Sequence, residues 1–345
     1  MRWFLGLLLV VALITGVLYG VGRFLLSNDL EVTRTVSVER PRAAVFAMVN
    51  DLRIAREWSP FYARDPDAEY AFSGDPGEGQ NMRWASNVRD VGRGRMSIVS
   101  SSPNQEVQSI LELGERATLN SIISLRPGQN ATAVEWRVTA QCGAGAINVP
   151  CRYMNLIMSR QVGQQLEGGL ARLKTLTEQL PNVDFEGLNP QFSAVEPQNF
   201  VYAVVETSAT DLAMIRGAEE LGIQQVRDFM AQYGLTPSGP LVRVVTLHDI
   251  AANRMSFRVG YPFAGATPLT VVGVQIGQTP SGQAMNVLVE GNGRQVQAAY
   301  AQMYAYLQAH RIPLREGGLP WEIVHQAASP DGATPARMEI FIPLQ

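Results

Sequence analysis

The sequence has few of the residues that build metal centres or nucleic-acid surfaces. Its 345 residues include two cysteines and three histidines, which excludes a cysteine-rich zinc module and leaves little for a histidine metal site. Lys174 is the only lysine, and the 28 basic residues are balanced by 31 acidic ones. A chain without a polycationic segment is not expected to bind nucleic acid. We therefore expect no metal, no cofactor and no nucleic-acid partner.

Charge is also missing from one long stretch. Residues 3–22 read WFLGLLLVVALITGVLYGVG, 20 residues without a charged side chain, and a helix of that length spans about 30 Å, the thickness of a bilayer's hydrocarbon core. A cleaved signal peptide usually has an apolar region of about 7–15 residues before an Ala-x-Ala site, and no such site follows here. Most helices of globular proteins have a polar face, which this run lacks, so a core helix is the less favoured alternative. We interpret residues 1–27 as a transmembrane anchor.

The charges beside this run favour one orientation. Arg2 and the terminal amine precede it, whereas Arg23 is soon followed by Asp29 and Glu31. The positive-inside rule then favours a cytoplasmic N-terminus. We expect a single-pass protein of the inner, cytoplasmic membrane, whose soluble domains lie on the periplasmic or extracytoplasmic side.

The two cysteines bear on that localisation. Cys142 and Cys151 lie nine positions apart in CGAGAINVPC, and a local disulfide between them fits an oxidising compartment. Two unrelated buried thiols are the alternative.

The rest of the chain predicts two domains. It is globular in composition, with 46% hydrophobic and 17% charged residues overall, and it is long enough for more than one core. Near residues 182–197 a long helical pattern stops and PNVDFEGLNPQFSAVEP follows, with three prolines and no sustained periodicity, which is typical of a linker. The expected domains are residues 28–181 and 198–345.

The first domain has the pattern of an α+β fold. A strand over residues 32–38 and a short helix from Pro41 precede several stretches of alternating apolar residues, most of them separated by Gly and Pro, as in an antiparallel meander. A final helix has a one-sided apolar stripe. The stripe consists of Leu166, Leu170, Leu173 and Leu180. We expect this helix to lie across the concave face of a curved antiparallel sheet.

These segments resemble the SRPBCC family, also called START-like or polyketide cyclase-like. The opening RPRAAVFAMVNDLRIAREWSPF, the hairpin YAFSGDPGEGQNMRWAS and the strands RGRMSIVSSSPNQEVQSIL have the family's pattern over about 150 residues. The resemblance implies a helix-grip fold with a mainly apolar cavity between the long helix and the sheet. Family members bind lipids, hormones or polyketides, and some catalyse cyclisation or aromatisation.

Three tryptophans are candidates for lining such a cavity. Trp58, Trp84 and Trp136 would provide large apolar contact areas, although each is also a normal core residue. Three strand carboxylates, Glu106, Glu112 and Glu135, would have to be buried to act as general acids or bases, and surface positions are commoner. The domain contains no histidine. We assign no catalytic residue.

The second domain reads as an internal duplication of strand, helix, strand, strand. FVYAVVE, a helix over about 211–233, GLTPSGPLVRVV and RMSFRVGYPF are followed by AMNVLVE, a second helix, RIPLREGGLPWEIV and RMEIFIPL. The copies match at nearly one offset, with Pro240 opposite Pro320 and Arg254 opposite Arg337. Two such modules should form a pseudo-symmetric pair with a ligand cleft between them.

This half resembles the GyrI-like small-molecule-binding domain, also called the AraC-type effector-binding domain. The matching piece is AYAQMYAYLQAHRIPLREGGLPWEIVHQAASPDGATPARMEIFIPL. The resemblance implies that the family's ligand-binding glutamate falls on Glu322 and its helix tyrosine on Tyr300. Two departures put the family's aromatic cage and its reported hydrolase activity in doubt. Val324 replaces the tyrosine of the E-x-Y motif, and Glu290-Gly291-Asn292 stands where His-x-Gly is common.

Glu322 is also a candidate site on physical grounds. It lies on a predicted strand beside Trp321, which we also predict to be a ligand-binding residue. In an apolar cleft the charge of Glu322 would need a partner such as a ligand cation. Nearby aromatic faces, from Tyr300, Tyr202 or Tyr261, would add cation–π attraction. A surface position or an internal arginine pair is the alternative. We interpret the dispersed histidines, His248, His310 and His325, as structural or surface residues.

The leading hypothesis is a membrane-anchored binding protein for small hydrophobic or amphipathic molecules. Its helix-grip domain would hold an apolar ligand, and its GyrI-like domain an amphipathic or cationic one. An enzyme, either cyclase-like in the first domain or a hydrolase in the second, is the alternative. A third hypothesis treats both domains as protein-interaction surfaces near the membrane. The sequence identifies neither the ligand nor a protein partner.

Overall fold

The computed structural model describes residues 2–60, 62, 64–89, 91–114, 117–143, 148–268, 271–327, 329 and 335–345. The chain divides into two compact units, unit 1 up to Glu186 and unit 2 from Gly187. The boundary falls inside the expected linker, but Gln191–Val195 of that segment form a strand, β8, that pairs with Gly282–Gly291 (β14). Pro190 and Pro197 lie outside this strand, where their missing amide donors leave the ladder intact.

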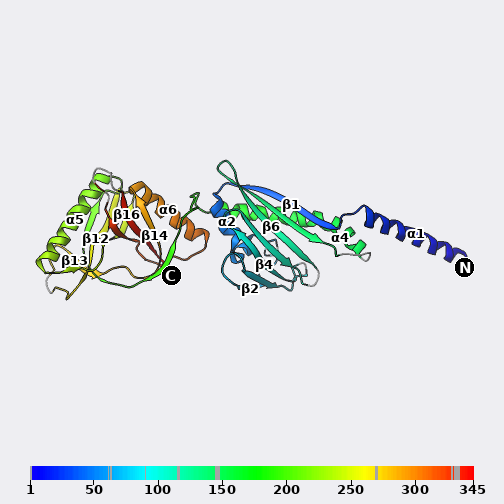
Figure 1. Cartoon of the computed structure of the whole chain (residues 1–345), viewed down its shortest axis with the longest axis horizontal. Helices are drawn as coiled ribbons and strands as arrows, with labels where there is room; N and C mark the ends of the chain where they lie inside the picture. The colour runs from blue at the N-terminus through cyan, green and yellow to red at the C-terminus, as the bar shows by residue number, and fades with distance from the viewer. Residues whose placement is uncertain are drawn as a thin grey trace. The chain divides into compact units, whose positions relative to one another are not determined.

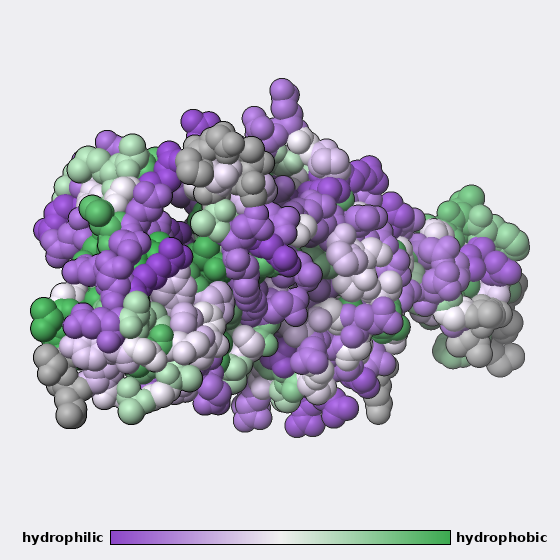
Figure 2. Space-filling view, turned by 60° about the vertical axis from the view of Figure 1, so that its left-hand side comes forward, coloured by the Kyte–Doolittle hydropathy of each residue, from purple (hydrophilic) through white to green (hydrophobic). Residues whose placement is uncertain are grey.

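The apolar run near the N-terminus forms α1, Arg2–Phe24. Within it, Gly6–Phe24 has a mean hydropathy of 2.1 and is long and apolar enough to cross a membrane, with only 6% of its most apolar window buried. Among the described residues it is the one helix that meets these criteria. Figure 2 shows the green, hydrophobic surface of α1 at the right-hand end of the molecule.

The described residues of unit 1 form a seven-stranded antiparallel sheet and, besides α1, three helices (Figure 1). In chain order the elements are β1 Asp29–Val38, α2 Arg42–Asn50, α3 Leu52–Trp58, β2 Glu69–Ser73, β3 Asn81–Ala85, β4 Arg93–Ser102, β5 Glu106–Glu112, β6 Thr118–Pro127, β7 Thr132–Gln141 and α4 Val149–Glu178. The sheet order is β1-β7-β6-β5-β4-β3-β2, so the first strand pairs with the last and the short helices connect the two edges.

The last helix of unit 1, α4, packs its apolar stripe against this sheet. Leu166, Leu170 and Leu173 are buried, as are the alternating positions Val134, Trp136 and Val138 of β7. The expected α+β fold, with a long helix after an antiparallel sheet, is confirmed.

Unit 2 is built on a second antiparallel sheet. Besides β8 and β14, its elements are β9 Asn199–Thr207, α5 Leu212–Gln232, β10 Thr236–Pro237, β11 Leu241–Asp249, β12 Arg254–Ala264, β13 Gln275–Gln278, α6 Gly293–Ala309, β15 Trp321–Gln326 and β16 Ala336–Pro343. The main path is β13-β9-β12-β11-β15-β16-β14-β8. The run β9-β12-β11 is therefore followed by its counterpart in reverse, β15-β16-β14, and β11 and β15 pair at the centre.

Both helices of unit 2 begin at a capping side chain. The Asp211 carboxylate accepts hydrogen bonds from the Ala213 and Met214 amides, and Asn292 forms a capping box with Gln295. These caps satisfy amide groups that have no partner within the helix. The helices start there for this reason, directly after β9 and β14.

We expect Leu173→Ala to destabilise unit 1 by about 2–5 kcal/mol, because it removes a fully buried side chain and leaves a cavity. Leu173 is 0% exposed, whereas Leu221, also on a helix, is 74% exposed. The matched control Leu221→Ala should change the free energy of unfolding by less than about 0.5 kcal/mol. Urea unfolding of both variants measures the difference, and equal effects would contradict the proposed packing of α4.

Candidate ligand-binding sites

The three tryptophans of unit 1 lie in its core, where Trp58 and Trp136 are next to α4. All three are buried, and the rings of Trp58 and Trp136 meet edge to face at 5.4 Å. The Trp58 indole donates to the Met48 carbonyl at 2.9 Å and that of Trp136 to Ser121 Oγ at 2.8 Å. These contacts are those of core residues, and neither of the two pockets described below is lined by Trp58, Trp84 or Trp136.

A pocket of about 350 Å³ lies on α4, where the segment after α3 approaches it. Its lining residues are Pro60, Arg64, Gln161, Gln164, Gln165, Gly168 and Arg172. The Arg172 guanidinium donates to the Trp58 carbonyl through Nε at 3.3 Å and Nη2 at 3.1 Å, and burial lowers the pKa of Arg172. The pocket is thus lined by arginine and glutamine side chains, and one of them, Arg172, is bonded to the buried Trp58. Such a lining suits a ligand with a polar or anionic head.

A second polar feature of unit 1 lies near the end of α3. The Arg56 guanidinium carbon is 5.6–5.9 Å from the ring centres of Tyr62, Tyr70 and Phe72, within cation–π range. Arg56 Nε and the Tyr70 hydroxyl are buried without a hydrogen-bond partner in the described part of the chain, and burial raises the pKa of Tyr70. Because Tyr70 pairs with Trp84 across β2 and β3, these unpartnered atoms lie on the face of the sheet that carries the core.

In unit 2, Glu322 takes part in a buried ionic network at the centre of the sheet. Glu322 is 2% exposed and pairs in register with Arg243 of β11. Arg243 Nε donates to Glu322 Oε2 at 2.5 Å, while Nη1 lies 3.2–3.3 Å from the carboxylate oxygens of Glu219 on α5. The Tyr300 hydroxyl of α6 donates to Glu322 Oε1 at 2.9 Å. Both helices and both central strands therefore contribute to the network.

The network holds Arg243 in its charged form. Burial lowers the pKa of Arg243, but the carboxylates of Glu322 and Glu219 raise it, and the resulting pKa is above its ordinary value. Burial, followed by the charge of Glu322, raises the pKa of Tyr300 well above its ordinary value, so this tyrosine stays a neutral donor. Arg243 therefore compensates the charge of Glu322 within the protein. This is the internal arginine pair expected from the sequence as the alternative to a ligand cation.

Of the aromatic residues expected near Glu322, only Tyr300 contacts it. Trp321 stacks on Phe341 at 4.9 Å on the opposite face of the sheet, and Tyr202 belongs to the same opposite-face cluster. Tyr261 accepts a hydrogen bond from Arg227 of α5. Alternation along the strands separates Trp321 and Tyr202 from Glu322. Tyr261 lies two residues after Val259, the register partner of Arg243, and so is on the same face as Glu322, but its hydroxyl is bonded to α5. Arg243 and Glu219 were not predicted; the signal for Arg243 was a lone charge in the apolar run LVRVV.

The opposite face of unit 2 carries a pocket of about 280 Å³. Trp321 and Phe200 line it together with Val244, Leu319, Arg258 and Arg315, and residues 278–281, 317–318 and 343 complete it. Arg315 Nη1 donates to the Ser281 carbonyl at 2.6 Å. Trp321, predicted as a ligand-binding residue, thus lines a pocket that Glu322 does not share.

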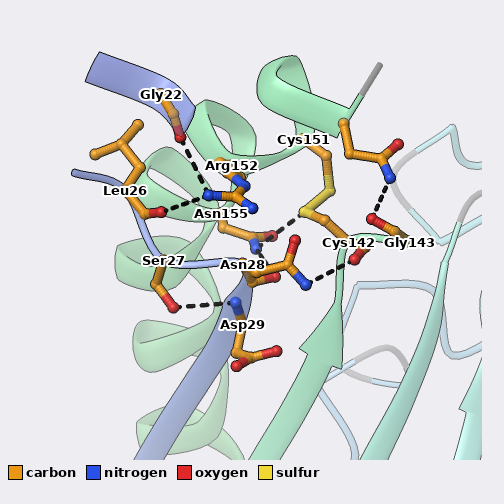
Figure 3. The surroundings of a disulfide bond; sticks show 11 residues. Gly22, Leu26, Ser27, Asn28, Asp29, Cys142, Gly143, Cys151, Arg152 and Asn155 are labelled. Atoms are coloured by element: carbon orange, nitrogen blue, oxygen red, sulfur yellow. Dashed lines mark hydrogen bonds between the residues drawn. A yellow bond between two sulfur atoms is a disulfide. The ribbon is translucent and has the colours of Figure 1, made fainter. Parts of the chain in front are cut away.

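The other candidates have structural partners or an exposed position. Glu106 accepts from Gln108 and Ser124, Glu135 pairs with Arg137, and Glu112 is exposed. The described residues contain no group of His, Cys, Asp and Glu side chains that could hold a metal ion. Cys142 and Cys151 are joined by a disulfide, with their Cα atoms 5.9 Å apart (Figure 3); residues 144–147 of the loop that it closes lie outside the described residues.

Comparison with known proteins finds one family that is similar to part of unit 1. Residues 29–178 match the family described as polyketide cyclase / dehydrase and lipid transport. No curated protein matches the chain.

Three solved structures are each similar to less than half of the chain. One is the di-domain aromatase/cyclase StfQ of the steffimycin biosynthetic pathway, 13% identical over 44% of this chain and 51% of that one, with a TM-score of 0.34; the chain thus spans about half of its length. A second is MLL2253 of Mesorhizobium loti, which is 10% identical over 43% of this chain and 97% of that one, with a TM-score of 0.33. A third is Ara h 8.0201, which is 12% identical over 43% of this chain and 97% of that one, with a TM-score of 0.32. Similarities at this level carry no argument about function.

We expect Arg243→Met to destabilise unit 2 by about 3–5 kcal/mol, because it leaves the buried Glu322 carboxylate without its counter-charge. Adding Glu322→Leu should recover a large part of this loss, since the uncompensated charge is then removed. Urea unfolding followed by hydrogen exchange of unit 2 peptides measures both variants. A single variant as stable as the parent would show that the ionic pair is unimportant.

Proposed function

We propose that the chain is a membrane-anchored binding protein for a small hydrophobic or amphipathic molecule, which is held in unit 1. The observation that carries this proposal is the match of residues 29–178 to a family whose description includes lipid transport. It is supported by the arrangement of one long helix over an antiparallel sheet. On this basis we assign unit 1 a helix-grip fold.

The geometry of α4 supports an amphipathic ligand in particular. The pocket beside Gly168 has arginine and glutamine side chains at its surface, and Arg172 connects it to Trp58 of the apolar core. A polar head at Arg64 and Arg172 would leave the apolar part of the molecule to enter between α4 and the sheet. The unpartnered Arg56 and Tyr70 atoms offer further hydrogen-bond donors.

We further propose that α1 anchors the chain and that both units lie outside the cytoplasm. The length and hydropathy of α1 support a membrane span, and the disulfide between Cys142 and Cys151 fits an oxidising compartment. The positive-inside rule applied to Arg2 favours the same topology.

For unit 2 we propose a GyrI-like fold with a secondary role in ligand binding. The reversed strand order about β11 and β15 supports an internal duplication. A cationic ligand at Glu322 would have to displace Arg243, which already occupies both carboxylates. For this reason the proposal places the principal site in unit 1.

A bulky side chain at position 168 should exclude the ligand. Gly168 lines the pocket, and a Cβ there would meet only Arg172 Nη1 at 3.9 Å, so Gly168→Trp fills the pocket without disturbing the core. Gly217 of α5 is the matched control, because it is also a helical glycine with open space around it. Native mass spectrometry of the full chain, released from detergent, measures the bound molecule.

The parent and Gly217→Trp should retain one small hydrophobic molecule that Gly168→Trp loses. If all three proteins carry the same adducts, the pocket on α4 is not the binding site. If the parent carries none and a panel of lipids does not raise its melting temperature, the proposed function is wrong.

A further inference from the structure

The beginning of α4 extends beyond the sheet that the rest of the helix covers. After Val149, the first buried residue of this helix is Gly163. In the intervening turns, Met154, Leu156 and Ile157 are 55%, 62% and 68% exposed. Single exposed apolar residues are common in soluble proteins, but three large ones within about one helical turn indicate a contact surface. We call residues 149–160 the α4 overhang.

The overhang is attached to the end of α1 (Figures 1 and 3). The Tyr153 hydroxyl donates to the Leu18 carbonyl at 2.7 Å, and Arg152 Nη1 donates to the carbonyls of Arg23 at 2.8 Å and Leu26 at 3.2 Å. The Arg23 carbonyl is one of the groups that a helix end leaves without a partner, and Arg152 supplies one. The helices touch at Gly22, where a Cβ would lie 2.4 Å from Val149 Cγ1 and 2.7 Å from Tyr153 Cε2.

The same end of α4 is fixed to the sheet. The disulfide links Cys151 of α4 to Cys142, directly after β7. Asn28 Nδ2 donates to the Cys142 carbonyl at 2.8 Å, and the Cys142 amide donates to the Asn28 carbonyl at 3.0 Å. The end of α1, the first strand and the overhang therefore form one connected junction, shown in Figure 3.

The position of Tyr153 relates the overhang to the membrane. Leu18 precedes the end of α1 at Phe24 by six residues, a distance of about 9 Å along the helix. Leu18 also lies about 6 Å before Gly22, the last residue of the uncharged run. Where α1 spans a bilayer, the Tyr153 hydroxyl consequently lies close to the boundary between the hydrocarbon core and the interfacial layer, in which tyrosine is enriched. Ile157 follows one helical turn later, about 6 Å along α4.

We propose that the α4 overhang lies in the interfacial layer of the leaflet from which α1 emerges, with Met154, Leu156 and Ile157 in contact with phospholipid. This proposal rests on the proposed anchoring by α1. The apolar side chains then have the bilayer as their partner, and the arginine beside them, Arg152, remains bonded to the backbone at the end of α1. Interfacial helices of this kind bind through buried apolar area.

Site-specific photocrosslinking in a bilayer tests the proposal. The photoreactive residue p-benzoylphenylalanine replaces Ile157 in the full chain, reconstituted in nanodiscs of palmitoyl-oleoyl phosphatidylglycerol, and intact mass spectrometry detects the lipid adduct after illumination. Ile157 is 68% exposed, so the replacement leaves the core unchanged. Position 154 repeats the measurement. Position 13 in α1 is the control for anchoring, and exposed position 175 near the other end of α4 is the control for specificity.

We expect lipid adducts at positions 13, 154 and 157 and none at 175. Adducts at position 13 without adducts at 154 and 157 would overturn the proposal and leave the anchoring intact. The absence of adducts at 13 would instead contradict the anchoring. A crosslink from position 157 to a second protein chain, in place of lipid, would show that the overhang is a protein interface and would also overturn the proposal.

Discussion

The length of α4 is the constraint on which the arrangement of unit 1 depends. Its 30 residues extend for about 45 Å, whereas the longest strands of the sheet have 10 residues and extend for about 33 Å. One part of the helix can therefore bury a leucine stripe against the sheet, and another part cannot. The part without a sheet beneath it carries the exposed apolar residues, the contact with α1 and the disulfide, so a single helix connects the apolar core with the end of the candidate membrane span.

Unit 2 depends on a different constraint, the pairing of β11 with β15, which joins the strands β9-β12-β11 to the strands β15-β16-β14. Apolar residues at both central positions would stabilise such a junction without the cost of burying charge. The chain instead has Arg243 opposite Glu322, with Glu219 and Tyr300 contributed by the two helices. All the hydrogen bonds and ion pairs among these four side chains form only when both helices and both strands are in place. The network thus makes one register between β11 and β15 more favourable than any shifted one.

Local patterns predicted most of the elements, and non-local contacts account for what was missed. The uncharged run, the leucine stripe and the alternating stretches specify α1, α4 and the strands, because each is a property of neighbouring residues. Strand β8 was expected to be linker because its order comes from pairing with β14, which lies far along the chain. The choice between a disulfide and two thiols needed the approach of Cys142 and Cys151 in space.

The candidate sites show the same division between local and non-local information. The family resemblance identified Glu322 and Tyr300, which do contact each other. Alternation along the strand separates Trp321 from Glu322, but it does not reveal which face Tyr202 shares. Arg243 could be recognised as unusual within its strand, yet its role as the partner of Glu322 follows only from the register between β11 and β15.

The two proposals for unit 1 fit together through the position of the pocket on α4. Gln161, the first pocket residue of α4, follows Ile157 by one turn, about 6 Å. With the overhang in the interface, the pocket opens next to the headgroup layer. An amphipathic molecule could then pass from the leaflet to Arg64 and Arg172 while its apolar part avoids a long path through water. Because transfer of apolar surface into water costs about 25 cal/mol per Å², this short path favours exchange with the membrane over exchange with the aqueous phase.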